Sequence, residues 1–340
     1  MRATGVIVAM PLAERFTIAR GSEDVAEVVH VAVEHDGLTG WGEAAPIDRY
    51  DESAASALGF VERIGGELGG DPFALDEIEA RLAAEPGEHA AKAGLDAALH
   101  DLCGKLAGVP VWRLLGLRRS GPPTSWTIPL DDPDAMARKA ERTGGPFQRL
   151  KLKLGGGDGF DVDRVRAVRG VARVPMQVDV NEWWSLDEAL EALPQLAQLG
   201  VEYCEQPLPA GSADGPELRR RSPLPIFVDE DCHTLADVAP CADRAHGITI
   251  KLAKSGGIRE AVRMAHAARA LGLGVMLGCM VESGLGIAAG CQVASLCDHV
   301  DLDGNLLLAD DPCPGVELVD GVQVPPAAPG LGVQPVPVRA

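Results

Sequence analysis

Five ionisable side chains stand out in the second half of the chain because each follows a short apolar run. In order they are Lys153, Asp179, Glu205, Asp229 and Lys251. Successive members are 26, 26, 24 and 22 residues apart, which is close to the length of one strand plus one helix. This spacing predicts one charged group at the end of each of five consecutive strands, where all five would meet at one rim of a barrel.

The three acidic members of this series predict a metal site. Two carboxylates about 4 Å apart repel by roughly 4 kcal/mol at an effective dielectric constant near 20, so three of them need a counter-charge. Oxygen ligands from Asp179, Glu205 and Asp229, with room for water, are the set that Mg²⁺ selects. We therefore expect Mg²⁺ as the cofactor. Taken singly, each aspartate could instead cap the helix after its strand, and Glu205 could be a solvated loop acid.

Lysines flank the expected metal on two sides. Lys151 and Lys153 are two residues apart in an apolar run, so in a strand they share one face. Taken alone, a Lys-x-Lys pair is also typical of an edge strand, where charged side chains prevent pairing with a strand of another molecule. Beside a divalent cation, however, a lysine can lose its proton and act as a base. With Lys251 on the opposite side, two bases could invert a carbon centre, whereas a lyase or lactonising enzyme would need only one of them for proton transfer.

The elements that carry these residues alternate between strand and helix. We expect strands at 176–180, 226–228 and 248–252, helices at 185–199 and 258–271, and further strands near 274–280 and 299–303. This order predicts a parallel sheet with crossover helices, and the number of repeats predicts a closed α/β barrel.

The first 120 residues predict a separate α+β unit. We expect strands at 4–9 and 25–35 with a return through 40–43, a long loop at 15–22, and helices over 52–117. Gly121-Pro122-Pro123 is expected to link this unit to the barrel. The predicted domains are a cap at 1–120, a barrel at 121–310 and a segment at 311–340 that packs back toward the cap.

Composition excludes several classes of partner. The formal net charge of −19 would repel nucleic acids and anionic membranes, so we expect neither as a partner. Eight scattered cysteines indicate neither a disulfide framework nor a zinc site, and the N-terminus lacks the pattern of a signal peptide. A cytoplasmic protein with reduced thiols is the expectation.

The motifs around these residues resemble the muconate-lactonising-enzyme subgroup of the enolase superfamily. The likeness lies in residues 149–154, 178–181, 205–207, 228–230 and 250–258 of the barrel and in 40–44 and 97–110 of the N-terminal unit. It implies a modified TIM barrel of the (β/α)7β type with an α+β capping domain. It also implies that Asp179, Glu205 and Asp229 bind Mg²⁺, that Lys153 and Lys251 are the acid/base pair, and that Lys151 stabilises an enediolate.

Within that subgroup the C-terminal part looks most like the dipeptide epimerases. The likeness implies that Asp301 and Asp303 grip an α-ammonium group, that Glu282 and Ser283 contact substrate, and that Arg20 meets an acidic side chain of the dipeptide. Asp301 and Asp303 could also be a solvated acidic loop. The roles of Lys254, Asp231 and the glycine-rich loop at 155–159 stay open.

The prediction is therefore a Mg²⁺-dependent isomerase that inverts the Cα of the C-terminal residue of a dipeptide. L-Ala-D/L-Glu from murein peptides is the first substrate expected, and a homo-oligomer is the expected assembly. The alternatives are an o-succinylbenzoate synthase, an N-succinylamino acid racemase or a muconate-type cycloisomerase on the same site. A barrel that binds a ligand without turning it over is a third reading.

Overall fold

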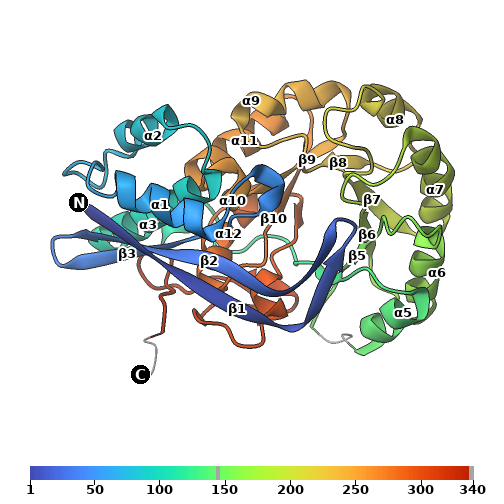
Figure 1. The fold of residues 1–340 in the computed structure, drawn as a ribbon, viewed down its shortest axis with the longest axis horizontal. Coiled ribbons are helices and arrows are strands. Elements are labelled where there is room, and N and C mark those ends of the chain that lie inside the picture. The colour runs from blue at the N-terminus through green and yellow to red at the C-terminus, as the bar shows by residue number, and fades with distance from the viewer. Residues whose placement is uncertain (143–145, 337–340) are drawn as a thin grey trace.

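The computed structural model describes residues 1–142 and 146–336, in which an antiparallel sheet with its helices lies against a barrel (Figure 1). The sheet has the order β1-β2-β3, from β1 (Arg2–Ile18), β2 (Gly21–His35) and β3 (Leu38–Ala44). Helices α1 (Ala54–Ile64) and α3 (His89–Ala107) pack on it, and α2 (Leu75–Ala84) packs against α3. A short turn, η1 (Asp48–Tyr50), and a short helix, α4 (Val111–Leu114), complete this part. The expected α+β arrangement is confirmed.

The prediction of a long loop at 15–22 is wrong. β1 and β2 continue through this stretch as a hairpin, with a register shift between Pro11 and Phe16 and a turn at Ala19 and Arg20. Thr17 and Ser22 face each other across the strands, with their hydroxyl oxygens 2.9 Å apart. Thr17 and Ile18 are β-branched and favour an extended backbone, so this stretch reaches over the barrel as strand and not as loop.

Helix α3 lies close against β3 because two glycines of that strand leave room for it. A Cβ atom at Gly40 would collide with the carbonyl oxygen of Ala98, and one at Gly42 with that of Gly94. Close approach of two backbones is a common reason for glycine within a strand. Helix α3 ends at Gly108, whose φ of 69° is readily adopted only by glycine.

The barrel is an eight-stranded sheet with the order β11-β10-β9-β8-β7-β6-β5-β4, and every neighbouring pair is parallel. Its strands are β4 (Trp126–Ile128), β5 (Leu150–Lys153), β6 (Met176–Asp179), β7 (Val201–Glu205), β8 (Ile226–Val228), β9 (Gly247–Lys251), β10 (Gly274–Gly278) and β11 (His299–Val300). A parallel bridge between Thr124 and Val300 joins the two edges and closes the ring.

Helices connect the strands around the outside of the ring (Figure 1). They are α5 (Pro133–Arg142), α6 (Asp161–Val171), α7 (Leu186–Gln198), α8 (Gly215–Arg221), α9 (Leu235–Val238), α10 (Leu252–Ser255), α11 (Ile258–Ala270) and α12 (Gly284–Cys291). Seven connections between eight strands are the (β/α)7β arrangement, so the predicted fold is confirmed.

The segment after the barrel forms a hairpin and then reaches the N-terminal part. The hairpin pairs β12 (Glu317–Val319) with β13 (Val322–Val324). Farther on, the backbone N–H of Leu331 donates to Asp101 Oδ1 on α3 at 2.7 Å. The division of the chain into domains at 120 and 310 stays a prediction. Within the described residues, no helix has the length and apolar character needed to cross a membrane.

Candidate active site

The charged residues face the barrel axis because side chains alternate along each strand. On β5, Leu150 and Leu152 belong to the apolar core between the sheet and its helices. Lys151 and Lys153 point the other way, and both are buried. The ammonium groups of both reach the same oxygen of Asp179, at 3.1 Å from Lys151 and 2.6 Å from Lys153. The two lysines therefore share one face of a barrel strand, and the edge-strand interpretation does not apply.

Lys151 is surrounded by three carboxylates. Besides Asp179, its Nζ atom lies 2.7 Å from Glu205 Oε2 and 2.7 Å from Asp301 Oδ2. Burial disfavours the ammonium form, but the charges of Asp301, Glu205 and Asp179 outweigh it and raise the pKa of Lys151 well above its ordinary value. These three carboxylates therefore favour the protonated form of Lys151 in this arrangement.

A second pair of lysines holds Asp229 on the other side of the ring. Lys251 Nζ lies 2.7 Å from Asp229 Oδ2, and Lys254 Nζ lies 2.6 Å from Asp229 Oδ1. Lys254 also donates to the carbonyl oxygens of Asp229 and Thr249, so all three of its protons are used. Its side chain has no exposed surface. Lys254 therefore holds Asp229 in place from within the protein interior, and it is not among the residues that line the cavity described below.

Glu205 differs from the two aspartates because neither of its buried carboxylate oxygens has a hydrogen-bond partner. The contact of Oε2 with Lys151 is close but lacks hydrogen-bond geometry. Burial and the charge of Asp179 raise the pKa of Glu205. Asp179 is equally buried, but the ammonium groups of Lys153 and Lys151 lower its pKa. A buried carboxylate without hydrogen bonds is costly unless it meets a cation or a proton.

The residues present fit a magnesium ion by the chemistry of their donors. Asp179 and Glu205 are direct neighbours across β6 and β7, and Asp229 follows β8, so the three carboxylates come from adjacent strands. Among residues 1–142 and 146–336, no three acidic, histidine or cysteine side chains already stand as a metal cage. Instead, the oxygens of Asp179 and Asp229 form ion pairs with lysine ammonium groups. A divalent cation would replace these ammonium groups as the counter-charge and would satisfy Glu205.

A cavity of about 120 Å³ lies above these charges. Its polar walls come from the strand ends, including Lys153, Lys251 and Asp301, and from Arg20 and Glu23 of the β1–β2 hairpin. Its apolar walls come from both parts of the chain and comprise Phe16, Ile18, Ile47, Tyr50, Met280, Val281 and Leu307. This cavity is thus built jointly by the barrel and by the strands and turns of the N-terminal part.

Other predicted site residues fall into two groups. Arg20 and Asp303 line the cavity with Asp301, and their roles in substrate binding stay predictions. Asp303 accepts the backbone N–H of Thr127 at 2.7 Å, whereas Asp301 Oδ1 has no hydrogen-bond partner.

Glu282 and Ser283 face the N-terminal sheet instead. The backbone N–H and the hydroxyl of Ser283 both donate to the carboxylate of Glu43 on β3. Glu282 Oε1 accepts the backbone N–H of Met280 at 2.9 Å. Neither residue is among those that line the cavity, and their role in substrate binding stays a prediction.

Two open questions from the sequence have structural answers. Asp231 accepts from Gln206, from the backbone N–H of Gly211 and from Arg244, so it ties neighbouring loops together. The glycine-rich loop turns back over Trp183. Gly155 has φ 91°, and a Cβ atom there would lie 2.7 Å from the Cβ of Trp183.

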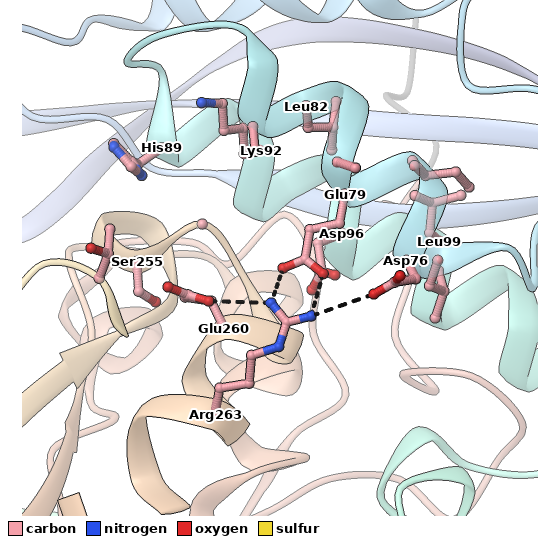
Figure 2. A pocket seen from close by; sticks show the side chains of 16 residues that line it. Asp76, Glu79, Leu82, His89, Lys92, Asp96, Leu99, Ser255, Glu260 and Arg263 are labelled. Atoms are coloured by element: carbon pink, nitrogen blue, oxygen red, sulfur yellow. Dashed lines mark hydrogen bonds and ion pairs between the residues drawn. The ribbon is translucent and has the colours of Figure 1, made fainter. Parts of the chain in front are cut away.

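A wider cavity of about 460 Å³ lies elsewhere, between α2 and α3 of the N-terminal part and α10 and α11 of the barrel. In Figure 2, Arg263 points from α11 toward Glu79 and Asp76 of α2. Its Nη2 atom donates to Glu79 Oε2 at 2.6 Å. None of the strand-end lysines and carboxylates lines this cavity, which is a charged junction between the two parts of the chain.

Sequence reasoning missed three residues around the active-site cavity. Glu182, Glu230 and Arg49 form ion pairs with one another or with Arg20. Glu230 was quoted only as part of a motif, and its burial raises its pKa to about 7 beside Asp229 and Asp179. Position beside or within a motif was the available signal for Glu182 and Glu230, but it does not reveal which loops meet, and Arg49 had no such signal.

The class that this fold and these charges define is an enolase-type barrel enzyme, in which lysine or histidine bases work beside Mg²⁺. Residues 134–338 match the family described as "Enolase C-terminal domain-like". Residues 2–116 match the N-terminal domain of the mandelate racemase/muconate lactonizing enzyme family. The chain belongs to this family.

Comparison with individual proteins gives high similarity along nearly the whole chain. The L-Ala-D/L-Glu epimerase of Bacteroides thetaiotaomicron is 38% identical over 322 residues, covering 94% of this chain and 84% of that protein. A dipeptide epimerase from Enterococcus faecalis, solved with Mg and L-Leu-L-Tyr, has a TM-score of 0.92 at 30% identity, with 98% of each chain covered. A muconate lactonizing enzyme from Pseudomonas fluorescens also has a TM-score of 0.92 at 30% identity, covering 98% of this chain and 96% of that one. The fold alone therefore does not separate the two activities.

Proposed function

We propose that this protein is a Mg²⁺-dependent dipeptide epimerase that inverts the Cα of the C-terminal residue. The observation that carries the proposal is the position of Lys153 and Lys251 in the ring. They end β5 and β9, which are four places apart in a closed ring of eight strands and so lie on opposite sides. One lysine would take the proton from one face of Cα, and the other would return a proton to the opposite face.

The carboxylates and Lys151 supply the electrostatics of this reaction. Asp179, Glu205 and Asp229 would hold Mg²⁺. The bound cation would draw charge from the substrate carboxylate and so acidify the adjacent Cα–H. Lys151, already protonated and buried, would stabilise the negative charge that develops on the substrate while the proton is absent.

A dipeptide fits the remaining wall better than a substrate without an amino group. Asp301 presents a buried oxygen that has no hydrogen-bond partner, and Asp303 is beside it on the cavity wall. An α-ammonium group would satisfy this oxygen, whereas muconate and succinylbenzoate have no such group. Arg20, which lines the same cavity from the β1–β2 hairpin, would meet an acidic side chain, so L-Ala-D/L-Glu is the first substrate to test.

The test is hydrogen exchange in D₂O with Mg²⁺ on a panel of dipeptides. Deuterium is expected at the Cα of the C-terminal residue alone, with both epimers appearing. Turnover of succinylbenzoate precursors, N-succinylamino acids or muconate, with no exchange into any dipeptide, would refute the proposal and support the alternative activities of this family.

The cellular setting is proposed from the same features. All eight cysteines are free in the structure, as expected for a reducing compartment. We place the protein in the cytoplasm, acting on peptides from cell-wall turnover. Assembly into a homo-oligomer stays a prediction, and size-exclusion chromatography with light scattering measures it.

A further inference from the structure

Lys251 is followed directly by a short helix, α10, that packs against α3 of the N-terminal part. The hydroxyl of Ser255, at the end of α10, donates to the carbonyl oxygen of Lys251 at 3.0 Å. Lys254 on the same helix donates to both the carbonyl oxygen and the carboxylate of Asp229. The placement of α10 therefore sets the positions of a proposed base and of a proposed metal ligand.

The end of α10 is a turn of two glycines that lies against Asp96 of α3. Gly256 and Gly257 have φ values of 99° and 123°, which other residues rarely adopt. Both of their N–H groups donate to the carbonyl oxygen of Leu252, at 3.0 and 3.2 Å. A Cβ atom at Gly257 would lie 2.5 Å from Asp96 Oδ2. The glycines therefore let the carboxylate of Asp96 come close to the backbone of the turn.

Asp96 also caps helix α11, which follows this turn. Its Oδ2 atom accepts the backbone N–H of Ile258, the first residue of α11, at 2.6 Å. Gly257, in the N-cap position, has no side chain that could do so. The first N–H groups of a helix need acceptors, and a carboxylate at this end interacts favourably with the helix dipole. A side chain from the N-terminal part thus fixes the point at which α10 ends and α11 begins.

Asp96, which lines the cavity of Figure 2, is itself held in place. The Nδ1 atom of His100 donates to the carbonyl oxygen of Asp96 at 2.8 Å and lies 3.4 Å from its Oδ2 atom. Burial disfavours the protonated imidazole, but the charge and hydrogen bonds of Asp96 outweigh it and raise the pKa of His100. The neighbouring Ala97 belongs to the same apolar core as Leu252 and Ile258. Asp96 is therefore a fixed contact between the two parts of the chain.

We propose that Asp96 is a positioning residue for Lys251, acting through the glycine turn and α10. It holds this base where it can reach the Cα of the substrate. The hydrogen bonds of the Lys153 ammonium group, to Asp179 and Asn181, stay within the barrel. Loss of Asp96 therefore impairs proton transfer on the face of Cα that Lys251 serves and spares the other face. This role rests on the proposed epimerase function.

Hydrogen exchange that starts from each pure epimer tests the two faces separately. In D₂O with Mg²⁺, Asp96→Ala should slow the exchange of one epimer of L-Ala-D/L-Glu about 10- to 100-fold, the effect of displacing a reacting group by about 1 Å. This should be the epimer that Lys251→Ala fails to exchange, and the other epimer should keep its rate. Asp96→Asn keeps an oxygen acceptor for the N–H of Ile258, so it should restore most of the lost rate.

Asp101→Ala is the matched control. Asp101 is a buried carboxylate on the same helix, and it accepts the backbone N–H groups of Trp41 and Leu331 at 2.8 and 2.7 Å. Neither of these partners belongs to α10 or α11. This variant should lose stability as Asp96→Ala does, but any slowing of exchange should be equal for the two epimers.

Amide hydrogen exchange measured by mass spectrometry tests the contact without turnover. In Asp96→Ala the peptide that spans 252–258 should exchange about tenfold faster, as expected for loss of a hydrogen bond to a charged group. The amides of β5, which carries Lys153, should keep their rates.

Equal slowing of both epimers by Asp96→Ala, or no slowing of either, would overturn the proposal. Unchanged amide exchange at 252–258 would overturn it as well. If Asp96→Ala does not fold, Ser255→Ala takes its place, because it removes the hydroxyl bound to the carbonyl of Lys251 and should slow the same epimer. A protein that epimerises no dipeptide would refute the proposed function, and amide exchange would still judge the contact of Asp96 with the turn.

Discussion

Lys151 and Asp301 form an ion pair across the seam where the barrel closes, with Nζ 2.7 Å from Oδ2. Lys151 belongs to β5 and Asp301 follows β11, so the pair spans β4, which lies between these strands in the closed ring. The contact links the wall that should bind the dipeptide ammonium to the charges that should bind the metal. Substrate binding and charge stabilisation are therefore expected to be coupled.

Loss of Lys151 should be severe for stability. Lys151→Met would leave Asp179, Glu205 and Asp301 without their shared buried partner, and breaking a buried pair costs about 3–5 kcal/mol. Urea denaturation with EDTA present measures this loss. Lys151→Met/Asp301→Asn should cost less than the sum of the two single changes. Arg221→Gln, in an exposed pair, should change the free energy of unfolding by less than about 1 kcal/mol.

Each of the two opposed lysines should be indispensable for epimerisation. Lys153→Ala and Lys251→Ala should each lower the rate of epimerisation by about 10²–10⁴-fold, the contribution of one general acid or base. Each variant should still exchange the Cα proton of the one epimer that the remaining lysine can reach. NMR in D₂O, started from each pure epimer, measures both rates. Normal epimerisation by either variant would exclude a two-base reaction.

Mg²⁺ should stabilise the fold through Glu205. At a concentration 100 times its dissociation constant, a ligand that binds only the folded state adds about 2.7 kcal/mol to the free energy of unfolding. Thermal unfolding with Mg²⁺ and with EDTA measures the difference, and Glu205→Gln should remove most of it. Glu202→Gln is the control. It lies on the same strand but points outward to Arg149, so a loss of the Mg²⁺ effect in this variant would argue against the proposed ligands.

Arg20 should determine the preference for an acidic side chain. Arg20→Gln should lower kcat/KM for L-Ala-L-Glu by about 10- to 100-fold, the value of a hydrogen bond to a charged group. L-Ala-L-Leu should be affected far less. Steady-state kinetics on the two dipeptides give the ratio. An equal fall for both would show that Arg20 supports the wall without contacting the side chain.

Glu282 should make stability depend on pH. Burial, with the charge of Glu43 adding to it, raises the pKa of Glu282 to about 8, whereas an unfolded glutamate titrates near about 4.3. Between these values the unfolded chain releases this proton and the folded protein keeps it. This group's contribution to the free energy of unfolding is therefore lost progressively as the pH rises from about 4 to about 8. Denaturation at a series of pH values should show a flatter profile for Glu282→Gln than for the wild type.

The order and spacing of the strand-end residues were sufficient to predict the barrel and its charged rim. Strand alternation placed Lys151 and Lys153 on one face, and the ring order of β5 and β9 agrees with the predicted opposition of Lys153 and Lys251. These features are local or periodic, so they can be read along the chain. When similar strand-helix repeats close into a ring, the carboxyl ends of their strands meet at one rim, so no long-range contact has to be known in advance.

Tertiary structure alone decided how the N-terminal part meets the barrel. Glu182 binds Arg49 across 133 positions of sequence, and Ser283 binds Glu43 across 240. No periodicity connects such pairs, because they form only when segments far apart in the sequence pack together. For the same reason the sequence gives no sign that Arg20 pairs with Glu182 and Glu230, and the contact of Arg20 with substrate stays a prediction. The positions of the charged residues at the rim follow from strand spacing, whereas the wall that encloses them depends on packing between distant segments.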